Sequence, residues 1–184
     1  MIEVVEKLSS IDRERIVALL QTSFDAYAKQ SEAEEEVDAL CQRDKVLLLK
    51  RHNGTIVGLI GAQAQYGTTG WELHPLLVEQ RYQRRGFGKA LVVALEDVLR
   101  ARGALVIYLG TDDEHFRTSL SDGDLFHDTF TKIRSLKNRA DHPYSFYVRC
   151  GYQVVGVIPD ANGWHKPDIM MAKRLHPYAA NKNT

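Results

Sequence analysis

The chain has 184 residues, 44% hydrophobic and 26% charged, which is the size and composition of one ordinary soluble domain. Lysine plus arginine and aspartate plus glutamate each number 24, so the formal net charge is zero. This balance offers no overall attraction to nucleic acid or to an anionic membrane, and no run approaches the roughly 18 apolar residues of a membrane span. We expect neither kind of partner.

Residues 1–8 are predicted to form the first strand. Charged side chains interrupt this segment, so it lacks the continuous apolar stretch of a secretory signal, and we expect a cytoplasmic protein. Ser10 precedes a stripe at helical spacing that predicts a first helix: Ile16, Leu20, Phe24 and Tyr27. A second helix is strongly acidic, and its acids form either a solvated face or one rim of a cation-binding cleft: Glu32, Glu34, Glu35, Glu36 and Asp38.

Three antiparallel strands are predicted next. Residues 46–50 and 55–65 are apolar runs separated by Asn53-Gly54, and Asn-Gly between such runs is the strongest short hairpin signal. A second turn at 67–70 leads into a third run at 71–78. The order of these runs predicts a meander of neighbouring strands.

The second half of the chain predicts a helix at 89–102, a buried strand at 104–109, a short helix at 124–136, a helix at 143–150 and strands at 152–158 and 168–173. Residues 176–184 are predicted to be a flexible tail. One domain is therefore expected to span residues 1–175.

The loop between the strand at 71–78 and the next helix is rich in glycine and arginine: Gln83, Arg84, Arg85, Gly86, Phe87 and Gly88. Glycines let backbone N–H groups approach an anion, and the following helix turns the positive end of its dipole toward the same point. The spacing matches neither a P-loop nor a Rossmann fingerprint. A pyrophosphate cradle is the functional hypothesis, and an ordinary glycine-rich connection is the alternative.

The pattern Gln-x-x-Gly-x-Gly after a strand resembles the acetyl-CoA signature of the GNAT superfamily of N-acetyltransferases, and the order of predicted elements is that of the GNAT fold. The resemblance implies the α+β acyl-CoA N-acyltransferase fold, with a mixed central sheet of six to seven strands flanked by helices. It also implies acetyl-CoA as the acetyl-donating cosubstrate, with the six loop residues binding its pyrophosphate. The seven histidines lack the spacing of a zinc motif, so no metal is expected.

Two titratable residues lie on one predicted face of the strand at 71–78. By the two-residue period, Glu72 and His74 point to one side while Trp71 and Leu73 point to the other. Glu72 is a candidate to take the proton of the substrate ammonium, and His74 is a second acceptor or an orienting partner. The alternative is a solvent-facing pair on an ordinary amphipathic strand.

Pro75 follows this pair and has no N–H to donate, so the strand must be interrupted or bulged there. In the family the corresponding strand splays and frees backbone donors for the cofactor. The resemblance therefore implies that Leu76, Leu77 and Val78 bind the cofactor through their backbone, with the Leu76 N–H as the catalytic oxyanion donor.

The segment from Phe146 to Tyr152 is similar to the family's Phe-Tyr-x-x-x-Gly-Phe/Tyr segment. By this resemblance Tyr147 contacts the cofactor and gives the departing thiolate its proton. A core aromatic residue is the alternative. Many family members hold the pantetheine arm through an asparagine where this chain has Ala140, so the nearby Asn138 is the candidate for that contact.

Several further segments resemble aminoglycoside 6′-N-acetyltransferases: residues 71–76, 109–113, 142–144, 156–163 and 166–173. The resemblance implies a homodimer that inactivates these antibiotics. Because aminoglycosides are polycations, the substrate site is assigned mainly to acids, with an aromatic wall: Tyr66, Glu72, Glu79, Asp112 and Asp113. Two alternatives remain: an acetyltransferase acting on a polyamine or a protein amine, and a non-catalytic acetyl-CoA-binding module.

Overall fold

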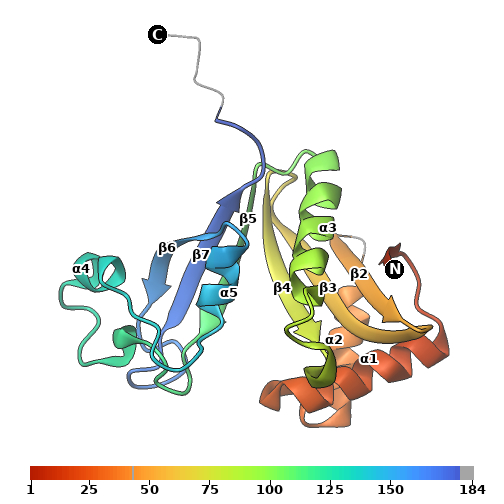
Figure 1. Ribbon diagram of the computed structural model, residues 1–184, viewed down its shortest axis with the longest axis horizontal. Coiled ribbons are helices and arrows are strands. Elements are labelled where there is room, and N and C mark those ends of the chain that lie inside the picture. Colours follow the sequence, from red (N-terminus) through yellow and green to blue (C-terminus); the bar gives the residue numbers. More distant parts are fainter. Residues whose placement is uncertain (43, 179–184) are drawn as a thin grey trace. The chain divides into compact units, whose positions relative to one another are not determined.

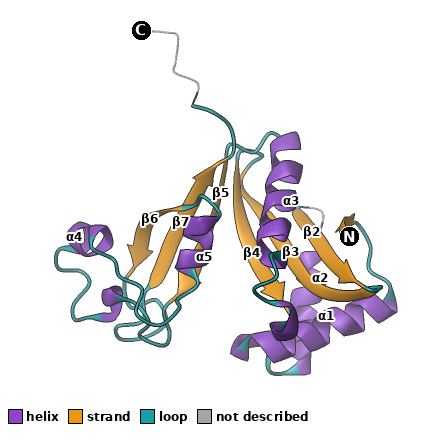
Figure 2. Cartoon of the chain, viewed as in Figure 1, coloured by secondary structure: helices purple, strands orange, loops and turns teal. Residues whose placement is uncertain are grey.

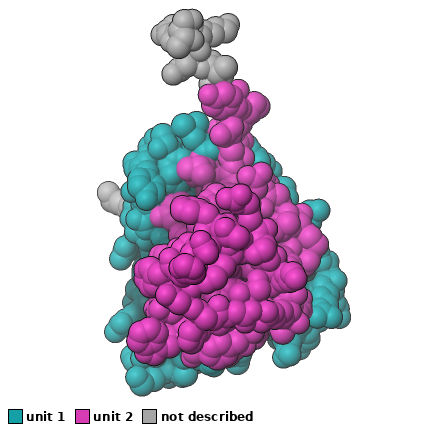
Figure 3. Space-filling model, turned by 90° about the vertical axis from the view of Figure 1, so that its left-hand side faces the viewer, with its two compact units in different colours: residues 1–105 teal, residues 106–184 magenta. Residues whose placement is uncertain are grey.

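The computed structural model describes residues 1–42 and 44–178. The chain divides into two compact units, Met1–Leu105 and Val106–Thr184, which Figure 3 colours separately. A single domain over residues 1–175 stays a prediction. Of the predicted tail, residues 176–178 belong to no helix or strand, and residues 179–184 lie outside the described residues.

The first unit contains four strands in its described part, paired antiparallel in the order β1-β2-β3-β4 (Figure 1). They are β1 (Ile2–Val5), β2 (Lys45–His52), β3 (Thr55–Tyr66) and β4 (Gly70–Val78). Its α-helices are α1 (Ser10–Ser23), α2 (Gln30–Leu40) and α3 (Phe87–Ala101), and its short 3₁₀ helices are η1 (Asp25–Tyr27) and η2 (Gln80–Tyr82). Asn53 and Gly54, both with positive φ, form the turn of the predicted hairpin between β2 and β3, so that prediction is confirmed.

Two apolar layers cover the opposite faces of this sheet. Leu59 belongs to the core cluster formed with α1 and α2, whereas a side chain at the neighbouring Gly58 would meet Leu91 of α3. Successive residues of a strand point to opposite faces, so α1 and α2 lie on one side and α3 lies on the other. Helices therefore cover both faces of this sheet.

The predicted first helix is confirmed, but the apolar stripe used to predict it extends beyond the end of the helix. Ser9 caps α1 by accepting from the Asp12 N–H, and the helix ends at Ser23. Phe24 is extended, and Tyr27 belongs to η1; both still pack against the core cluster of α1 and α2. The periodic spacing thus predicted their burial and missed the break in the helix.

The second unit contains three strands in its described part, paired antiparallel in the order β5-β7-β6: β5 (Val106–Asp112), β6 (Gln153–Ile158) and β7 (Asp168–Arg174). Its helices are η3 (Ser119–Ser121), α4 (Thr129–Arg134) and α5 (Tyr144–Arg149). The helix predicted at 124–136 is thus only the short α4. The strand predicted as continuously buried instead alternates, because Ile107 and Leu109 are buried while Val106 and Tyr108 are only half-buried.

The predicted fold class is confirmed. The described residues form seven strands accompanied by helices, the elements of an α+β protein (Figure 2). The order of helices and strands along the chain follows the order predicted from the sequence.

Candidate active site

A β-bulge interrupts the pairing of β4 with β3. Ile60 pairs with Leu76 and Ala62 pairs with Leu73, so the single residue Gly61 faces both His74 and Pro75. A side chain on Gly61 would lie 2.4 Å from the His74 carbonyl oxygen, so only glycine fits there. The bulge predicted from the missing N–H of proline is confirmed.

The bulge also changes which residues of β4 face α1 and α2. Before it, Trp71 and Leu73 are buried, and His74 on the opposite face contacts Tyr27 of η1. After it, Leu77 joins the core cluster of α1 and α2, and Glu79 pairs with Arg15 of α1. The two-residue period alone would have placed positions 77 and 79 on the face of Trp71. The bulge thus places His74, Leu77 and Glu79 on the same side of β4, the side that faces α1 and α2.

Backbone hydrogen bonding assigns a direction to the N–H groups that follow the bulge. The Glu79 N–H donates to the Val57 oxygen at 2.9 Å, and in an antiparallel pair alternate residues face the same neighbour. Leu77 is therefore directed toward β3, while Leu76 and Val78 direct their N–H groups away from it. Of the three predicted backbone donors, Leu76 and Val78 thus do not donate to β3, whereas the N–H of Leu77 does face that strand, which argues against its predicted role as a ligand donor.

The glycine-rich loop ends at the N-terminus of α3. Gly86 is the N-cap of this helix, with φ 80°, and no side chain among the described residues caps it. Its first N–H groups are thus left to an anion or water, and the helix dipole favours the anion. Gln83 donates to the Val78 carbonyl oxygen at 2.9 Å, which ties the start of the loop to the end of β4. The exposed arginines at 84 and 85 add positive charge.

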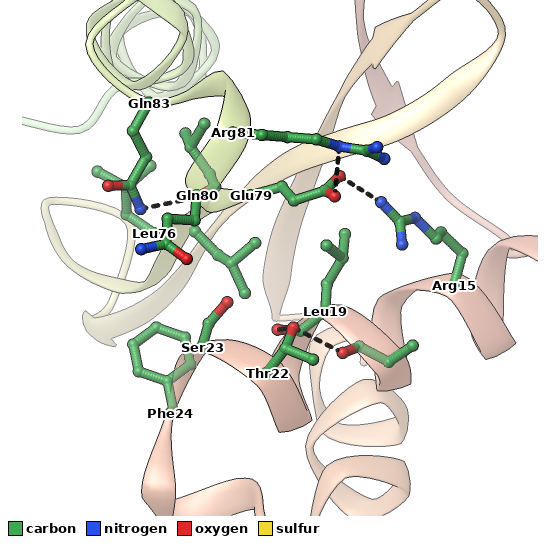
Figure 4. A pocket seen from close by; sticks show the side chains of 13 residues that line it. Arg15, Leu19, Thr22, Ser23, Phe24, Leu76, Glu79, Gln80, Arg81 and Gln83 are labelled. Atoms are coloured by element: carbon green, nitrogen blue, oxygen red, sulfur yellow. Dashed lines mark hydrogen bonds and ion pairs between the residues drawn. The ribbon is translucent and has the colours of Figure 1, made fainter.

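A pocket of about 700 Å³ lies within the first unit, between α1 and the segment from β4 to the loop (Figure 4). Leu76, Leu77, Val78 and Gln83, all predicted to bind the cofactor, line it. The facing wall comes from α1 between Arg15 and its end and from the residue after the helix: Arg15, Ala18, Leu19, Thr22, Ser23 and Phe24. The lining combines apolar side chains with hydroxyl, amide and charged groups, as expected of a site for a partly polar ligand.

Glu79, predicted to bind substrate, lies between two arginines of this pocket (Figure 4). One carboxylate oxygen is 2.5 Å from Arg15 and the other is 2.7 Å from Arg81. The negative charge of Glu79 is therefore already balanced, which favours a role in shaping the pocket over one in binding a cationic substrate.

The remaining predicted residues of the first unit lie toward the start of β4. Glu72 accepts a hydrogen bond from Gln65 at 2.9 Å, and Tyr66 is exposed at the end of β3. His74 has an exposed side chain whose Nε2 lies 3.2 Å from the Tyr27 hydroxyl and 3.7 Å from a Glu36 carboxylate oxygen. Tyr27 was not predicted to take part in the site, and Glu36 was named only as one of several acids that could form a rim of a cation-binding cleft.

The sequence held one signal for Glu36. It lies at the helical spacing of the buried residues Ala33, Val37 and Leu40, so a charged residue occupies the inner stripe of α2. Tyr27 carried no comparable signal, because the break after α1 that places it beside β4 is not visible in the apolar spacing.

Tyr147, the predicted proton donor, lies in α5 of the second unit. It is buried and packs edge-to-face against Phe146 and Tyr152. Burial raises the pKa of its phenol well above the ordinary value of 10, followed by a smaller effect of Cys150, so the hydroxyl is protonated at neutral pH. This protonation state suits a proton donor, and the packing equally suits the core role weighed above.

Three other predicted residues of the second unit are engaged in local structure. The buried Asp113 accepts hydrogen bonds from the Arg117 and Thr118 N–H groups and from two hydroxyls, and Asp112 accepts from Asn162. Asn138 donates to the His142 carbonyl and to Ser145. Asp113 and Asn138 therefore hold loops, which argues against their predicted ligand contacts. Spacing along the chain could not reveal these partners.

His142 makes this region sensitive to acid. The ring is buried, its Nε2 lies 3.0 Å from the Asp112 carbonyl oxygen, and its Nδ1 accepts from the Tyr144 N–H, so the neutral ring is the one that fits. Burial, opposed by the hydrogen bond to Asp112, lowers the pKa of His142 below its ordinary value of 6.5. The unfolded chain therefore binds more protons than the folded one below pH 6.5, and stability falls as the pH drops through this window.

We expect the melting temperature to fall as the pH drops through 6.5, the ordinary pKa of histidine, at a free-energy cost of at most about 1.4 kcal/mol per pH unit from this residue. His142→Gln should flatten that dependence, because it retains an N–H donor and does not titrate. His127→Gln, at a side chain that is 80% exposed, is the control and should behave as the unmodified protein. Equal acid sensitivity in all three proteins would contradict the assignment.

A bulged strand, an uncapped helix N-terminus behind a glycine loop and an adjoining pocket are together the features of an acyl-CoA-binding N-acyltransferase. Residues 13–120 match the acetyltransferase (GNAT) family. The chain belongs to this family, as the sequence predicted, and acetyl-CoA is its cosubstrate.

Solved structures give the same result over nearly the whole chain. An aminoglycoside 6′-N-acetyltransferase complexed with coenzyme A is 40% identical, with a TM-score of 0.94 over 98% of this chain and 99% of that one. The aminoglycoside 6′-N-acetyltransferase from Enterococcus faecium is also 40% identical, with a TM-score of 0.92 and the same coverage. An aminoglycoside 6′-acetyltransferase type Ii is 34% identical, with a TM-score of 0.77 over 97% and 99%. Among curated protein sequences, none matches this chain significantly.

Two further features concern the described residues only. They contain no group of three or more histidine, cysteine, aspartate or glutamate side chains placed to hold a metal ion. Within residues 1–42 and 44–178, no helix is both long and apolar enough to cross a membrane.

Proposed function

We propose that this protein transfers the acetyl group of acetyl-CoA to the 6′-amino group of aminoglycoside antibiotics and thereby confers resistance to them. The observation that carries the proposal is the 40% identity to aminoglycoside 6′-N-acetyltransferases over 98% of the chain. The bulge at Gly61 and the uncapped N-terminus of α3 support it, because they fit the needs of an acyl-CoA ligand independently of that identity.

Acetyl-CoA supplies an activated acetyl group as a thioester. We assign its pyrophosphate to the glycine loop, Gln83 to Gly88, and its pantetheine arm to the pocket beside Leu76 and Val78. The Leu76 N–H, directed away from β3, is assigned to the thioester carbonyl oxygen, where negative charge develops as the amine attacks. A backbone donor at such a position is worth about 3–4 kcal/mol in acyl-transfer enzymes.

The amine must be neutral to attack, so a group of the protein must accept the ammonium proton. Glu72 and His74, on the side of β4 opposite Trp71, are assigned this role, either directly or through water. The new C–N bond forms as the C–S bond breaks, and Tyr147 is assigned to protonate the departing thiolate. Tyr66 and Glu72 are assigned to the substrate side of the site.

The protein is further proposed to act as a cytoplasmic homodimer. Acetyl-CoA is an intracellular metabolite, which supports the location, and the homodimer follows from the resemblance to aminoglycoside acetyltransferases. Size-exclusion chromatography with light scattering tests the oligomeric state directly.

The substrate class is tested by thiol release from acetyl-CoA with neomycin B, spermidine and a lysine peptide as acceptors. We expect turnover with neomycin B and a kcat/KM at least about 100-fold lower for the other two, because a site shaped for one polycation binds others poorly. Turnover with spermidine or peptide alone would favour a polyamine or protein acetyltransferase. Binding of acetyl-CoA without thiol release for any acceptor would favour a non-catalytic module.

A further inference from the structure

Three side chains from three elements of the first unit meet beside the bulge. His74 of β4 lies with its Nε2 3.2 Å from the hydroxyl of Tyr27 in η1 and 3.7 Å from Oε1 of Glu36 in α2. The proposed mechanism uses only His74. The other two residues therefore need an explanation of their own.

Glu36 differs from the other acids of α2. Glu32 pairs with Lys29, Glu34 accepts from Gln30, and Asp38 pairs with Arg13, all on the outer surface of the first two helices. Glu36 lies instead on the inner stripe of the helix, with a side chain only 15% exposed. The general acidity of α2, which suits a solvated surface, therefore does not explain why the Glu36 carboxylate faces β4.

One oxygen of Glu36 is unusual for a buried acceptor. Oε1 is shielded from solvent and has no hydrogen-bond partner among the described residues. Leaving a buried acceptor unsatisfied costs free energy, so such an atom in a folded protein calls for a reason. At 3.7 Å from His74 Nε2 it is too far for a hydrogen bond and close enough to attract a positive charge on the ring.

The surroundings of Nε2 also decide which ring nitrogen carries the proton. A carboxylate only accepts hydrogen bonds, so it favours an N–H on the nitrogen that faces it. Burial, with further contributions from the charge of Glu36 and a hydrogen bond to its side chain, raises the pKa of Tyr27 to about 12, so the hydroxyl stays protonated. When this hydroxyl donates to Glu36, its oxygen is left to accept from an N–H at Nε2 of His74. A proton on Nε2 leaves the lone pair on Nδ1. The other acid on this face, Glu72, is hydrogen-bonded to Gln65.

We propose that Glu36 is a positioning residue for acetyl transfer: it holds His74 with the proton on Nε2, so that Nδ1 accepts the proton of the substrate ammonium. The proton moves from the substrate nitrogen to Nδ1, and the resulting imidazolium is stabilised by the Glu36 carboxylate on its other side. The ring then releases this proton to solvent. This inference rests on the proposed function, because it assigns a role in deprotonating the acceptor amine.

The first test does not require turnover. Long-range ¹⁵N–¹H spectra of the full chain at about pH 8.5 report the tautomer of His74, and the His74→Asn spectrum identifies its signals. We expect the Nε2–H form to predominate in the unmodified protein and its share to fall in Glu36→Gln, while Glu35→Gln, at an exposed position on the same helix, leaves it unchanged. A predominant Nδ1–H form in the unmodified protein would overturn the proposal without any variant.

The second test measures kcat and KM with neomycin B. Glu36→Gln should lower kcat roughly 10- to 100-fold, with little change in the KM for acetyl-CoA, since loss of an orienting partner impairs proton transfer and not cofactor binding. In the His74→Asn background the same substitution should have almost no further effect. Equal loss in both backgrounds would overturn the proposal. A Glu36-dependent Nε2–H tautomer in a protein that does not acetylate neomycin B would refute the proposed function and leave the orienting contact intact.

Discussion

Replacing Leu76 by proline is expected to lower kcat by roughly 100- to 1,000-fold, the loss typical of removing one oxyanion donor. The backbone alternation set by the bond from Glu79 to Val57 directs the Leu76 N–H away from β3. Proline therefore removes this donor without removing a hydrogen bond between β3 and β4. Pro75 precedes the site and is already in a strand, which is the conformation that a following proline favours.

The matched control is Leu76→Ala, which shortens the side chain and keeps the N–H. We expect it to retain kcat within a few fold, because the proposed contact is made by the backbone. Steady-state kinetics of both variants, with melting temperatures to establish folding, separate the two effects. A folded Leu76→Pro protein with nearly normal kcat, or equal losses in both variants, would refute the backbone assignment.

Gly61→Ala is expected to be the most damaging small substitution in the sheet. Its new Cβ would lie 2.4 Å from the His74 carbonyl oxygen and 3.2 Å from the carbonyl carbon, and these are backbone atoms that cannot move aside as a flexible side chain would. The bulge must then rearrange, at a cost of about 1–3 kcal/mol in the free energy of unfolding or more. Rearrangement would also displace His74 and redirect the Leu76 N–H, so activity should fall with stability.

Gly156→Ala in β6 provides the comparison. It is also a strand glycine at an irregular pairing, but the nearest atom to an added Cβ is 3.9 Å away, so its effect should stay within about 0.5 kcal/mol. Urea unfolding of both variants measures the difference. If Gly61→Ala were as stable and active as Gly156→Ala, the proposed dependence of the β4 backbone on glycine at position 61 would be refuted.

The sequence was most informative where backbone chemistry alone decides the structure. Pro75 lacks an N–H, so a bulge followed directly from its presence in a strand, and Asn53-Gly54 predicted its tight turn for a similarly local reason. The placement of the glycine loop before α3 was likewise predictable, because glycine near a helix start has a limited set of uses. These local rules predicted the bulge and the glycine loop, the two features to which the cofactor is assigned.

The partners of charged side chains, whether from a neighbouring loop or from a distant element, were much harder to predict. Asp113 was expected to bind substrate, yet its carboxylate accepts hydrogen bonds from residues four to eight positions ahead and is fully buried. Glu79 was expected to attract a cation, yet Arg15, 64 positions away, already pairs with it. An acidic residue in a sequence signals charge, and only the fold shows whether that charge is free to act.

The most direct measurement of the central claim is acetyl-CoA-dependent thiol release with neomycin B and paromomycin, two analogues that carry an amine and a hydroxyl respectively at the 6′ position. An enzyme that acetylates the 6′-amine should turn over neomycin B and leave paromomycin essentially unmodified, although paromomycin retains its other amines. Equal turnover of the two would contradict 6′-N-acetylation, and turnover of neither would contradict the assignment to aminoglycosides altogether.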